Sequence, residues 1–560
     1  MASRTQQVTV LTRSVLAAHA AALAVVLIAL LPVIGTSGQF SADEGAAIAQ
    51  ARQLDRGDGW TVPHQFAAAD PDGSAFAYEQ SNRGGDGYAA FAKHPVYPVV
   101  LAAAYRVLGR PGMLLVSIAG TVLAAFLTAL LSRRFDPRLA VPALWIVGVA
   151  SPLFFDSYTV IAHSVGAACA AFAVWCVLRA IEGRGRWWPL AIVLTLMLGV
   201  MLRNEMLFLG LALAIALLLH RGERKEWRLA AAAFAGVAIG FVLDRALLNV
   251  VVPGPVAQTP WLSNPSEGFL AARFSALKTT WLLVSYDLQP GDVLLAVAVV
   301  FAVVAAALAR SKPEERDGIR MFTMVAIAAA VAWLVLGVGP VPGILPACPL
   351  IVIGIVAWDR RPLPAPAGRL FVITFVLFAI AVTATEYSSG GSGEWGGRYF
   401  AIGLPLVVPV ALWAAVQLGR KLDRTTAMLG IAAVVVLGLV LSVQAVITLR
   451  QFHNDVDTLV AGIDANVRAQ PATDGGPPVV LSSDGAAGRF AFTVVEHSRW
   501  LTVAPDRLAE YARRLHDLDV GPITFVTRKA ADLARFGDLY QSVGETHPLP
   551  GWIVVTLQPR

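Results

Sequence analysis

The residues best placed to do chemistry in this sequence are two adjacent acids, Asp43 and Glu44, just beyond the first long apolar segment. That segment, from about Val15 to Ile34, contains no charged residue, and the acids open a polar stretch that runs to about His94. A carboxylate at the edge of a membrane span is costly to place and is often functional. The pair therefore indicates chemistry at the membrane surface, on a substrate that the lipid presents.

The same acids have an ordinary structural interpretation. They open a helical stretch from Asp43 to Leu54, whose small apolar side chains could form one face of a helix lying along the membrane interface. Acids at the start of a helix also complement the helix dipole. The local pattern alone leaves helix capping and function equally open.

Membrane spans must position these acids. Of the 560 residues, 56% are hydrophobic and 15% are charged, whereas a soluble protein has about 25% charged residues. Uncharged apolar runs of spanning length recur along the chain. They predict about thirteen spans, near 15–35, 112–131, 139–155, 159–179, 188–202, 205–219, 229–250, 292–309, 320–338, 342–357, 370–385, 399–418 and 427–447. The predicted fold class is therefore a mainly α-helical, polytopic membrane protein.

The basic residues of the short loops predict the orientation. With the N-terminus inside, six alternate loops are basic: Arg133/Arg134/Arg138, Arg179/Arg184/Arg186, Arg221/Arg224/Lys225/Arg228, Arg310/Lys312/Arg316/Arg320, Arg360/Arg361/Arg369 and Arg420/Lys421/Arg424. The N-terminus is thus expected to be cytoplasmic, and loops 36–111, 251–291 and 386–398 extracytoplasmic. The formal charge of +6 reflects the inside loops, and the acidic first outer loop would repel nucleic acid.

After the last predicted span, the sequence changes character. Short apolar strands at Val479–Ser482, Trp500–Val503, Ile523–Val526 and Ile553–Leu557 alternate with helices such as Arg507–Leu515. We therefore predict a membrane domain of residues 1–447, followed by a small extracytoplasmic α/β domain of residues 448–560. The cysteines Cys169, Cys176 and Cys348 fall within predicted spans and indicate core packing.

A longer pattern surrounds the two acids. Lys93-His94-Pro95-Val96-Tyr97-Pro98 leads into an apolar stretch that ends in Tyr105-Arg106-Val107-Leu108-Gly109. Together these elements resemble the GT-C fold membrane glycosyltransferases that use polyprenyl-phosphate sugars, within them the protein mannosyltransferase and aminoarabinose transferase-like group. The resemblance covers roughly residues 10–220, with Val96 where that group usually has a second proline. It continues through Ser132–Phe135, Ser151–Phe155, Leu202–Glu205 and Arg398-Tyr399-Phe400 with Pro405.

The resemblance implies roles for individual residues. Asp43 matches the catalytic acid, and Glu44 matches a supporting or acceptor-positioning partner. Lys93, His94 and Arg398 are candidates for the donor phosphate, which a guanidinium can bind in a bidentate manner. The alternatives are a headgroup anchor for Lys93 and a snorkelling span flank for Arg398.

These residue types suit the chemistry that the resemblance implies. Nucleotide sugars are absent outside the cytoplasmic membrane, so the donor would be a sugar on a lipid phosphate. Phosphate leaves readily when cations hold it, whereas an acceptor hydroxyl needs a general base. One acid with one or two cations leads to inversion at the anomeric carbon, since a double displacement would need a second carboxylate as nucleophile.

Further candidates lie on the same predicted face. Asp156, beside Tyr158 and His163, could be a second acid, and either Asp43 or Asp156 could bind a divalent metal; a solvated turn and a packing histidine are the alternatives. Arg203 and Glu205 could contact substrate but are expected to form a structural clasp. The glycine-rich segment 390–397 is expected to be a flexible loop carrying the substrate candidates Glu394 and Trp395, with Trp395 stacking on a sugar, and Tyr399 follows it.

The sequence therefore predicts an inverting glycosyltransferase of a bacterial cytoplasmic (inner) membrane. It would move arabinofuranose or mannose from a polyprenyl phosphate, such as decaprenyl phosphate, to a cell-envelope glycan or glycolipid acceptor. Its partners would be the lipid-linked donor, that acceptor and membrane lipids, with no cofactor beyond a possible divalent metal. The alternatives are a protein O-mannosyltransferase, a non-catalytic envelope scaffold, and a transporter or flippase of lipid-linked glycans, although no internal repeat of the transporter kind is evident.

Overall fold

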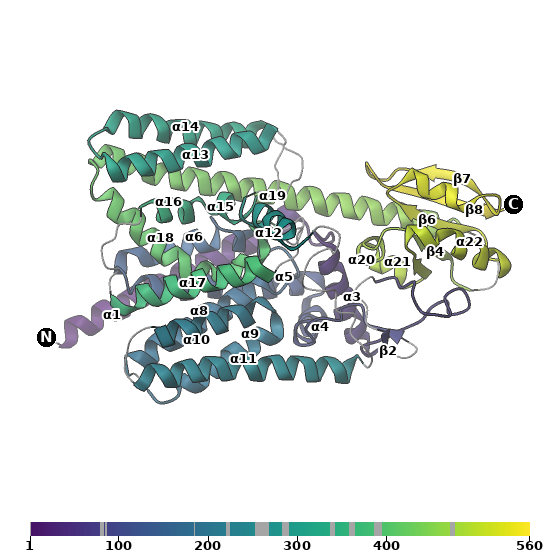
Figure 1. Cartoon of the computed structure of the whole chain (residues 1–560), viewed down its shortest axis with the longest axis horizontal. Coiled ribbons are helices and arrows are strands. Elements are labelled where there is room, and N and C mark those ends of the chain that lie inside the picture. The colour runs from purple at the N-terminus through teal and green to yellow at the C-terminus, as the bar shows by residue number, and fades with distance from the viewer. Residues whose placement is uncertain are drawn as a thin grey trace.

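The protein combines a bundle of long helices with a sheet-containing domain at one end (Figure 1). A computed structural model describes residues 2–78, 83–84, 87–183, 185–219, 224–252, 268–282, 290–336, 342–357, 365–385, 395–470 and 476–560. The N-terminus lies at the far end of the bundle and the C-terminus at the far end of the sheet domain, so the molecule is elongated (Figure 1).

Long apolar helices build the bundle, because a chain segment in lipid must satisfy its backbone hydrogen bonds internally. In the described part of the chain, nine helices are long and apolar enough to cross a membrane. They are formed by α1 (Ala2–Ala29) with α2 (Leu31–Ile34), α5 (Arg110–Ser132), α8 (His163–Ile181), α11 (Arg224–Val251), α13 (Pro290–Ser311), α14 (Arg316–Leu336), α17 (Ala365–Thr385), η3 (Arg398–Gly403) with α18 (Leu404–Gly419), and α19 (Arg424–Arg468). The protein is therefore a multi-pass membrane protein, as predicted.

The remaining predicted spans are shorter helices or pairs of helices. They correspond to η1 (Pro137–Leu139) with α6 (Ala140–Gly148) and α7 (Pro152–Asp156), to α9 (Trp188–Leu202), to α10 (Glu205–Leu219), and to α15 (Ile344–Ala347) with α16 (Pro349–Ala357). Proline explains two of the interruptions, because Pro152 and Pro349 each begin a new helix. The α9–α10 break occurs where Arg203 adopts an extended backbone conformation.

The long segment between the first two spans contains the helix that carries the two acids. It forms α3 (Ala42–Arg56), a small sheet of order β1-β3-β2 (Val62–Pro63, Gly87–Tyr88, Arg83–Gly84), and α4 (Val96–Leu108). The Ser41 side chain accepts a hydrogen bond from the Glu44 backbone N–H and caps α3, and Gly57 ends the helix in the left-handed region at φ 82°. The predicted helix is thus confirmed.

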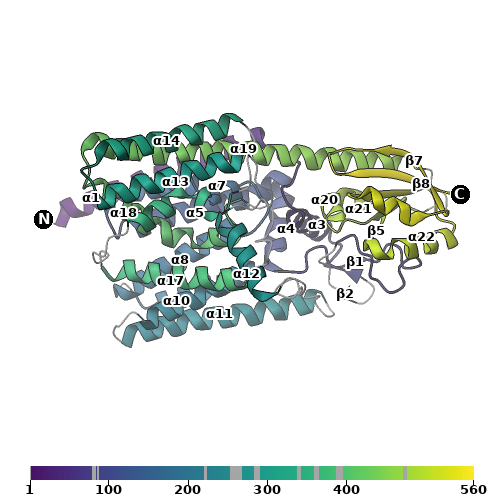
Figure 2. The ribbon, with the colours of Figure 1, turned by 45° about the horizontal axis from the view of Figure 1, so that its top comes forward.

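The position of α3 along the membrane interface stays a prediction, but its apolar face does not lie open to lipid. Residues 44–51 of α3 are all buried, because α4 packs on one side and the C-terminal domain covers another (Figure 2). The apolar face of α3 therefore contacts protein.

The C-terminal domain is joined to the bundle by one continuous helix. The last span, α19, has 45 residues and extends beyond the bundle to the sheet domain (Figure 1). The predicted domain boundary at residues 447 and 448 falls inside this helix, because the polar residues that follow the span still form regular helix.

Within residues 476–560, a five-stranded mixed sheet has the order β5-β4-β6-β8-β7. Strand β4 (Val479–Ser482) pairs in parallel with β5 (Arg499–Thr502) and β6 (Ile523–Thr527), whereas β8 (Ile553–Pro559) pairs antiparallel with β6 and β7 (Tyr540–Thr546). The four predicted strands are confirmed. Strand β7 was missed, because it is largely exposed and polar.

Three groups of short helices complete this domain and its contact with the bundle. Helix α22 (Leu508–Asp517) buries Leu508, Tyr511, Ala512 and Leu515. The one-turn helices α20 (Ala487–Phe490) and α21 (Phe492–Val495) pack against α3, and the 3-10 turns η4 (Pro505–Arg507) and η5 (Ala530–Phe536) contact α22. The site on α3 therefore lies where the membrane domain meets the C-terminal domain (Figure 2).

Candidate functional site

Asp43 lies in the first turn of α3 and is the centre of a cluster of charged residues. Lys93 Nζ donates to Asp43 Oδ2 at 3.0 Å, and Arg398 Nη2 donates to the same oxygen at 3.1 Å. Arg489 Nη1 donates to the other oxygen, Oδ1, at 3.1 Å. These cations come from the loop before α4, from the start of η3 and from α20 in the C-terminal domain. The cluster therefore exists only in the folded chain.

The cations decide the charge state of Asp43. Burial by itself would raise the pKa of this carboxyl, but the positive charges of Lys93, Arg398 and Arg489 outweigh burial and hold the pKa well below its ordinary value. Burial lowers the pKa of Lys93, and the neighbouring charge of Asp43 opposes that shift. The cluster has more positive than negative charge, which favours binding of a further anion such as a phosphate.

Glu44 accepts hydrogen bonds from backbone N–H groups and supports the fold. Its Oε2 accepts a hydrogen bond from the Phe40 backbone N–H, and its Oε1 accepts one from the Val160 N–H, each at 2.8 Å. Burial raises the pKa of Glu44, and the charge of Arg110 and these backbone donors oppose the rise. Glu44 therefore fixes α3 to the segment between α7 and α8, and this arrangement supports a positioning role.

Asp156 and His163 form a buried pair next to the cluster. Asp156 Oδ1 and His163 Nδ1 are 3.4 Å apart, and His163 is within electrostatic range of Asp43, Lys93 and Arg398. Tyr158 donates its hydroxyl to the Leu27 carbonyl at 3.0 Å and is fully buried. Tyr158 therefore ties this segment to α1.

The described residues do not provide a fitting metal site. Among them, no group of three or more His, Cys, Asp and Glu side chains is arranged to hold a metal ion. Asp43 is engaged by cations, and Asp156 has His163 beside it. The donor set around Asp43 suits an anion better than a divalent cation, and we assign no step to a metal.

Arg203 and Glu205 form the expected clasp. Arg203 Nε donates to Glu205 Oε2 at 2.9 Å and Arg203 Nη2 donates to Oε1, which makes the pair bidentate. The pair links the end of α9 to the start of α10. The charge of Arg203 also reaches Lys93, so the clasp lies close to the cluster.

Two expectations about single residues need correction. His94 does not join the phosphate candidates, because its Nδ1 lies 3.2 Å from Asp244 Oδ1 on α11 and both side chains are buried. Trp395 has no face open for a sugar, since it is 2% exposed and stacks on Phe155 with ring centroids 5.5 Å apart. Glu394 lies outside the described residues.

Tyr399 contacts a cation of the cluster. Its ring lies beneath the guanidinium of Arg398, with 5.0 Å between the guanidinium carbon and the ring centroid. A cation–π contact of this kind orients the guanidinium. Tyr399 therefore helps to aim Arg398 towards Asp43.

Sequence reasoning missed Arg489. It lies 446 residues from Asp43 along the chain, in a domain whose function the sequence did not indicate. A single sequence contains no signal that pairs these two positions, because their contact depends on how the domains dock.

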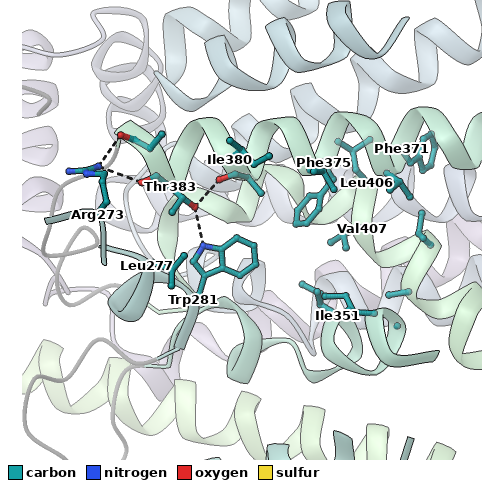
Figure 3. A pocket seen from close by; sticks show the side chains of 18 of the residues that line it. Arg273, Leu277, Trp281, Ile351, Phe371, Phe375, Ile380, Thr383, Leu406 and Val407 are labelled. Carbon is teal, nitrogen blue, oxygen red and sulfur yellow. Dashed lines mark hydrogen bonds between the residues drawn. The ribbon is translucent and has the colours of Figure 1, made fainter. Parts of the chain in front are cut away.

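Sequence reasoning also missed an apolar cavity in the bundle. The cavity has a volume of about 760 Å³ and lies between α12 (Phe269–Leu277), η2 (Lys278–Leu282), α16, α17 and α18. Figure 3 shows Phe371, Phe375 and Ile380 along one wall. Its lining is almost entirely hydrophobic, with Arg273 at one end.

The cavity wall is connected to the charged cluster. Trp281 Nε1 donates to Thr383 Oγ1 at 3.0 Å (Figure 3), and the Trp281 ring packs on Phe400 with centroids 4.9 Å apart. Phe400 is two residues from Arg398 in the same short helix, η3. The cavity wall therefore contacts the short helix that presents Arg398.

One family model agrees with the resemblance noted in the sequence. Residues 92–245 match the protein family described as dolichyl-phosphate-mannose-protein mannosyltransferase. Among solved structures, the enzyme ArnT from Cupriavidus metallidurans bound to undecaprenyl phosphate is 14% identical, with 96% of this chain and 97% of that chain covered and a TM-score of 0.48. The apo state of the same enzyme is 16% identical, with 99% and 98% covered and a TM-score of 0.48. A comparison with curated proteins gives no match.

Proposed function

We propose that this protein is an inverting glycosyltransferase with a polyprenyl-phosphate sugar as donor, and the match of residues 92–245 to the dolichyl-phosphate-mannose-protein mannosyltransferase family supports this proposal. The observation that carries the proposal is the Asp43 carboxylate held by Lys93, Arg398 and Arg489. A general base next to a phosphate-binding group of cations is what transfer from a lipid phosphate needs.

In this mechanism the donor phosphate and Asp43 compete for the same cations. The phosphodiester of the donor carries a negative charge, and on binding it takes hydrogen bonds from Lys93 and Arg398. Asp43 loses part of its cationic shell and becomes a stronger base. Donor binding thus activates the base at the step in which it is needed.

Transfer then proceeds as a single displacement. Asp43 takes the proton of the acceptor hydroxyl, whose oxygen forms the new bond to the anomeric carbon. The bond between that carbon and the phosphate oxygen breaks, and its electron pair leaves with the polyprenyl phosphate. The cations neutralise the charge that develops on the phosphate, and the attack inverts the anomeric configuration.

The apolar cavity suits the lipid part of such a donor. Its volume of about 760 Å³ lies within the usual range for ligand cavities, roughly 300–1,000 Å³. Its wall residue Trp281 packs against the helix that presents Arg398. A polyisoprenoid chain in the cavity would leave its phosphate near the charged cluster.

We further propose arabinofuranose or mannose as the sugar and a cell-envelope glycan or glycolipid as the acceptor, on the outer face of a bacterial cytoplasmic membrane. The basic loops support an inside N-terminus and an outside C-terminal domain. Single cysteines at Arg134 and Glu496, in a variant without native cysteines, test this orientation. An impermeant thiol reagent added to intact cells should label position 496 and spare position 134.

The activity is tested with synthetic polyprenyl-phosphate sugars and the purified protein. Asp43→Asn should lower transfer by about 10²–10⁴-fold, the usual contribution of a general base, and should still bind polyprenyl phosphate. Asp58→Asn, an exposed acid just after the same helix, is the matched control and should keep full transfer. A transporter or a scaffold would show no transfer that depends on Asp43.

A further inference from the structure

The C-terminal domain reaches into the charged cluster through Arg489. This residue lies on the one-turn helix α20, is 8% exposed, and contacts Asp43 Oδ1 at 3.1 Å. Its Nε donates to the Gly485 carbonyl at 3.3 Å. The guanidinium is therefore held in the direction of Asp43 by its own domain.

The backbone around Arg489 is fixed on α3 by close contacts. Gln39 Nε2 donates to the Arg489 carbonyl at 3.2 Å and to the Phe490 carbonyl at 2.9 Å. Gly45 faces the same carbonyl so closely that a Cβ atom at position 45 would collide with it. A glycine one turn into α3 thus permits the approach that brings Arg489 to Asp43.

A second set of contacts secures the domain on the other end of α3. Arg52 Nη2 and Arg56 Nη1 each pair with a carboxylate oxygen of Glu496 at 2.9 Å. Gln65 Nε2 donates to the Val495 carbonyl at 3.0 Å. The domain is therefore docked along the length of α3.

Each carboxylate oxygen of Asp43 contacts cations from a different domain. Lys93 and Arg398, from the membrane domain, contact Oδ2, and Arg489, from the C-terminal domain, contacts Oδ1. An anion that replaces the carboxylate would be held between both domains. We infer that the C-terminal domain is part of the donor site and that Arg489 binds the phosphate of the polyprenyl-phosphate donor.

This inference rests on the proposed function and can fail independently of it. The direct test is binding of polyprenyl monophosphate to the full-length purified protein. Removing one charge-assisted hydrogen bond in Arg489→Ala should weaken binding by about ten- to a hundredfold. Arg489→Lys keeps the positive charge but loses the bidentate geometry of the guanidinium, so its affinity should lie between those of wild type and Arg489→Ala.

A matched control and a second variant separate this role from folding. Arg513→Ala removes an exposed arginine of the same domain, which donates to the Ala509 carbonyl within its own helix, and should leave binding unchanged. Gly45→Ala retains every charge but pushes the Arg489 backbone away from α3. It should weaken binding as well, with binding measured on the folded fraction because the collision with backbone also lowers the melting temperature.

The outcomes distinguish the two proposals. If wild type binds polyprenyl monophosphate and shows transfer dependent on Asp43, while Arg489→Ala and Gly45→Ala bind as tightly as wild type, the role of Arg489 is wrong and the proposed function stands. If wild type shows neither binding nor transfer, both proposals are wrong. If Arg489→Ala and Gly45→Ala both bind more weakly while Arg513→Ala binds as tightly as wild type, the inference is supported.

Discussion

The Asp43 side chain has two roles. In the free protein it is the counter-ion that lets Lys93, Arg398 and Arg489 lie close together, because like charges at this distance repel one another. In the proposed reaction it is the base that accepts a proton. The same contacts that stabilise the free site make Asp43 a weak base until a phosphate takes its place.

The cations predict the pH dependence of stability. They hold the pKa of Asp43 well below its ordinary value of 3.8, so its contribution to stability is present above about pH 4 and is lost as the pH falls towards the lowered pKa. The melting temperature of wild type should therefore exceed that of Asp43→Asn at neutral pH, and the difference should shrink below about pH 4. A difference independent of pH would contradict a charged Asp43.

A companion prediction concerns activity. Lys93→Gln removes one cation, so the pKa of Asp43 rises in the free protein. The pH profile of kcat/KM reports the ionisation of groups in the free enzyme. The fall of kcat/KM on the acidic side of this profile should therefore occur at higher pH in Lys93→Gln than in wild type. Lys312→Gln removes a distant exposed lysine, paired with Glu315, and should leave the profile unchanged.

Glu44 should behave as a structural residue. In Glu44→Gln, one carboxylate oxygen is replaced by an amide group that cannot accept the N–H of Phe40 or Val160. An unsatisfied buried donor costs about 1–3 kcal/mol, so thermal unfolding should occur at lower temperature while the folded fraction retains transfer. Glu315→Gln, at an exposed position, serves as the control; a fully folded but inactive Glu44→Gln would instead assign Glu44 to the chemistry.

At the scale of elements, the site depends on where helices begin and end. Ser41 and the first turn of α3 present Asp43, the start of η3 presents Arg398, and α20 presents Arg489. Helices α5 and α8 cross closely beside the site, since a Cβ atom at Gly120 would collide with the backbone of Val165. Small residues at such crossings are typical of membrane helices, and they hold the ends of the helices in register.

Variants of the Arg203–Glu205 pair test whether the junction of α9 and α10 has only a structural role. Arg203→Ala alone leaves the Glu205 carboxylate buried and unpaired, which costs about 3–5 kcal/mol. The double variant Arg203→Met/Glu205→Leu should recover most of this stability. Transfer should recover with it, as measured on the folded fraction; a stable but inactive double variant would show that the pair binds substrate.

At the scale of the whole molecule, the long segment between the first two spans binds the C-terminal domain. Asp70 is the centre of this contact: Tyr511 donates its hydroxyl to Asp70 Oδ1 at 2.6 Å, and His64 Nε2 lies 2.8 Å from Oδ2. Burial opposes ionisation of Asp70, but these hydrogen bonds and those of nearby backbone N–H groups lower its pKa. Together with α19, this segment holds the C-terminal domain over α3.

Tyr511→Phe should loosen this contact without altering the bundle. The variant loses a hydrogen bond to a carboxylate, worth about 1.5–3 kcal/mol, so the segment between α3 and Tyr78 should be cut faster by a protease added to the outer face. Tyr540→Phe loses a hydrogen bond to the Val520 carbonyl inside the C-terminal domain and is the matched control. Equal cleavage rates in both variants would contradict an anchoring role for Asp70.

Much of the architecture was predictable because it depends on local sequence. A membrane span needs only a long uncharged apolar run, so the long helices are visible without tertiary information. Short apolar runs between helical segments likewise predicted β4, β5, β6 and β8, and the order of motifs after the first span selected Asp43, Lys93 and Arg398. The polar strand β7 lacked such a pattern and was missed.

The remaining features required the folded chain. Arg489, the pairing of His94 with Asp244, the burial of Trp395 and the apolar cavity all arise where segments far apart in sequence pack together. The basic loops and the order of motifs predicted that a carboxylate and cations lie on the same side of the membrane. Which cations reach that carboxylate was decided by the packing of the membrane domain for Lys93 and Arg398, and by the docking of the C-terminal domain for Arg489. Ion pairs form over a few ångströms in space, regardless of separation along the chain.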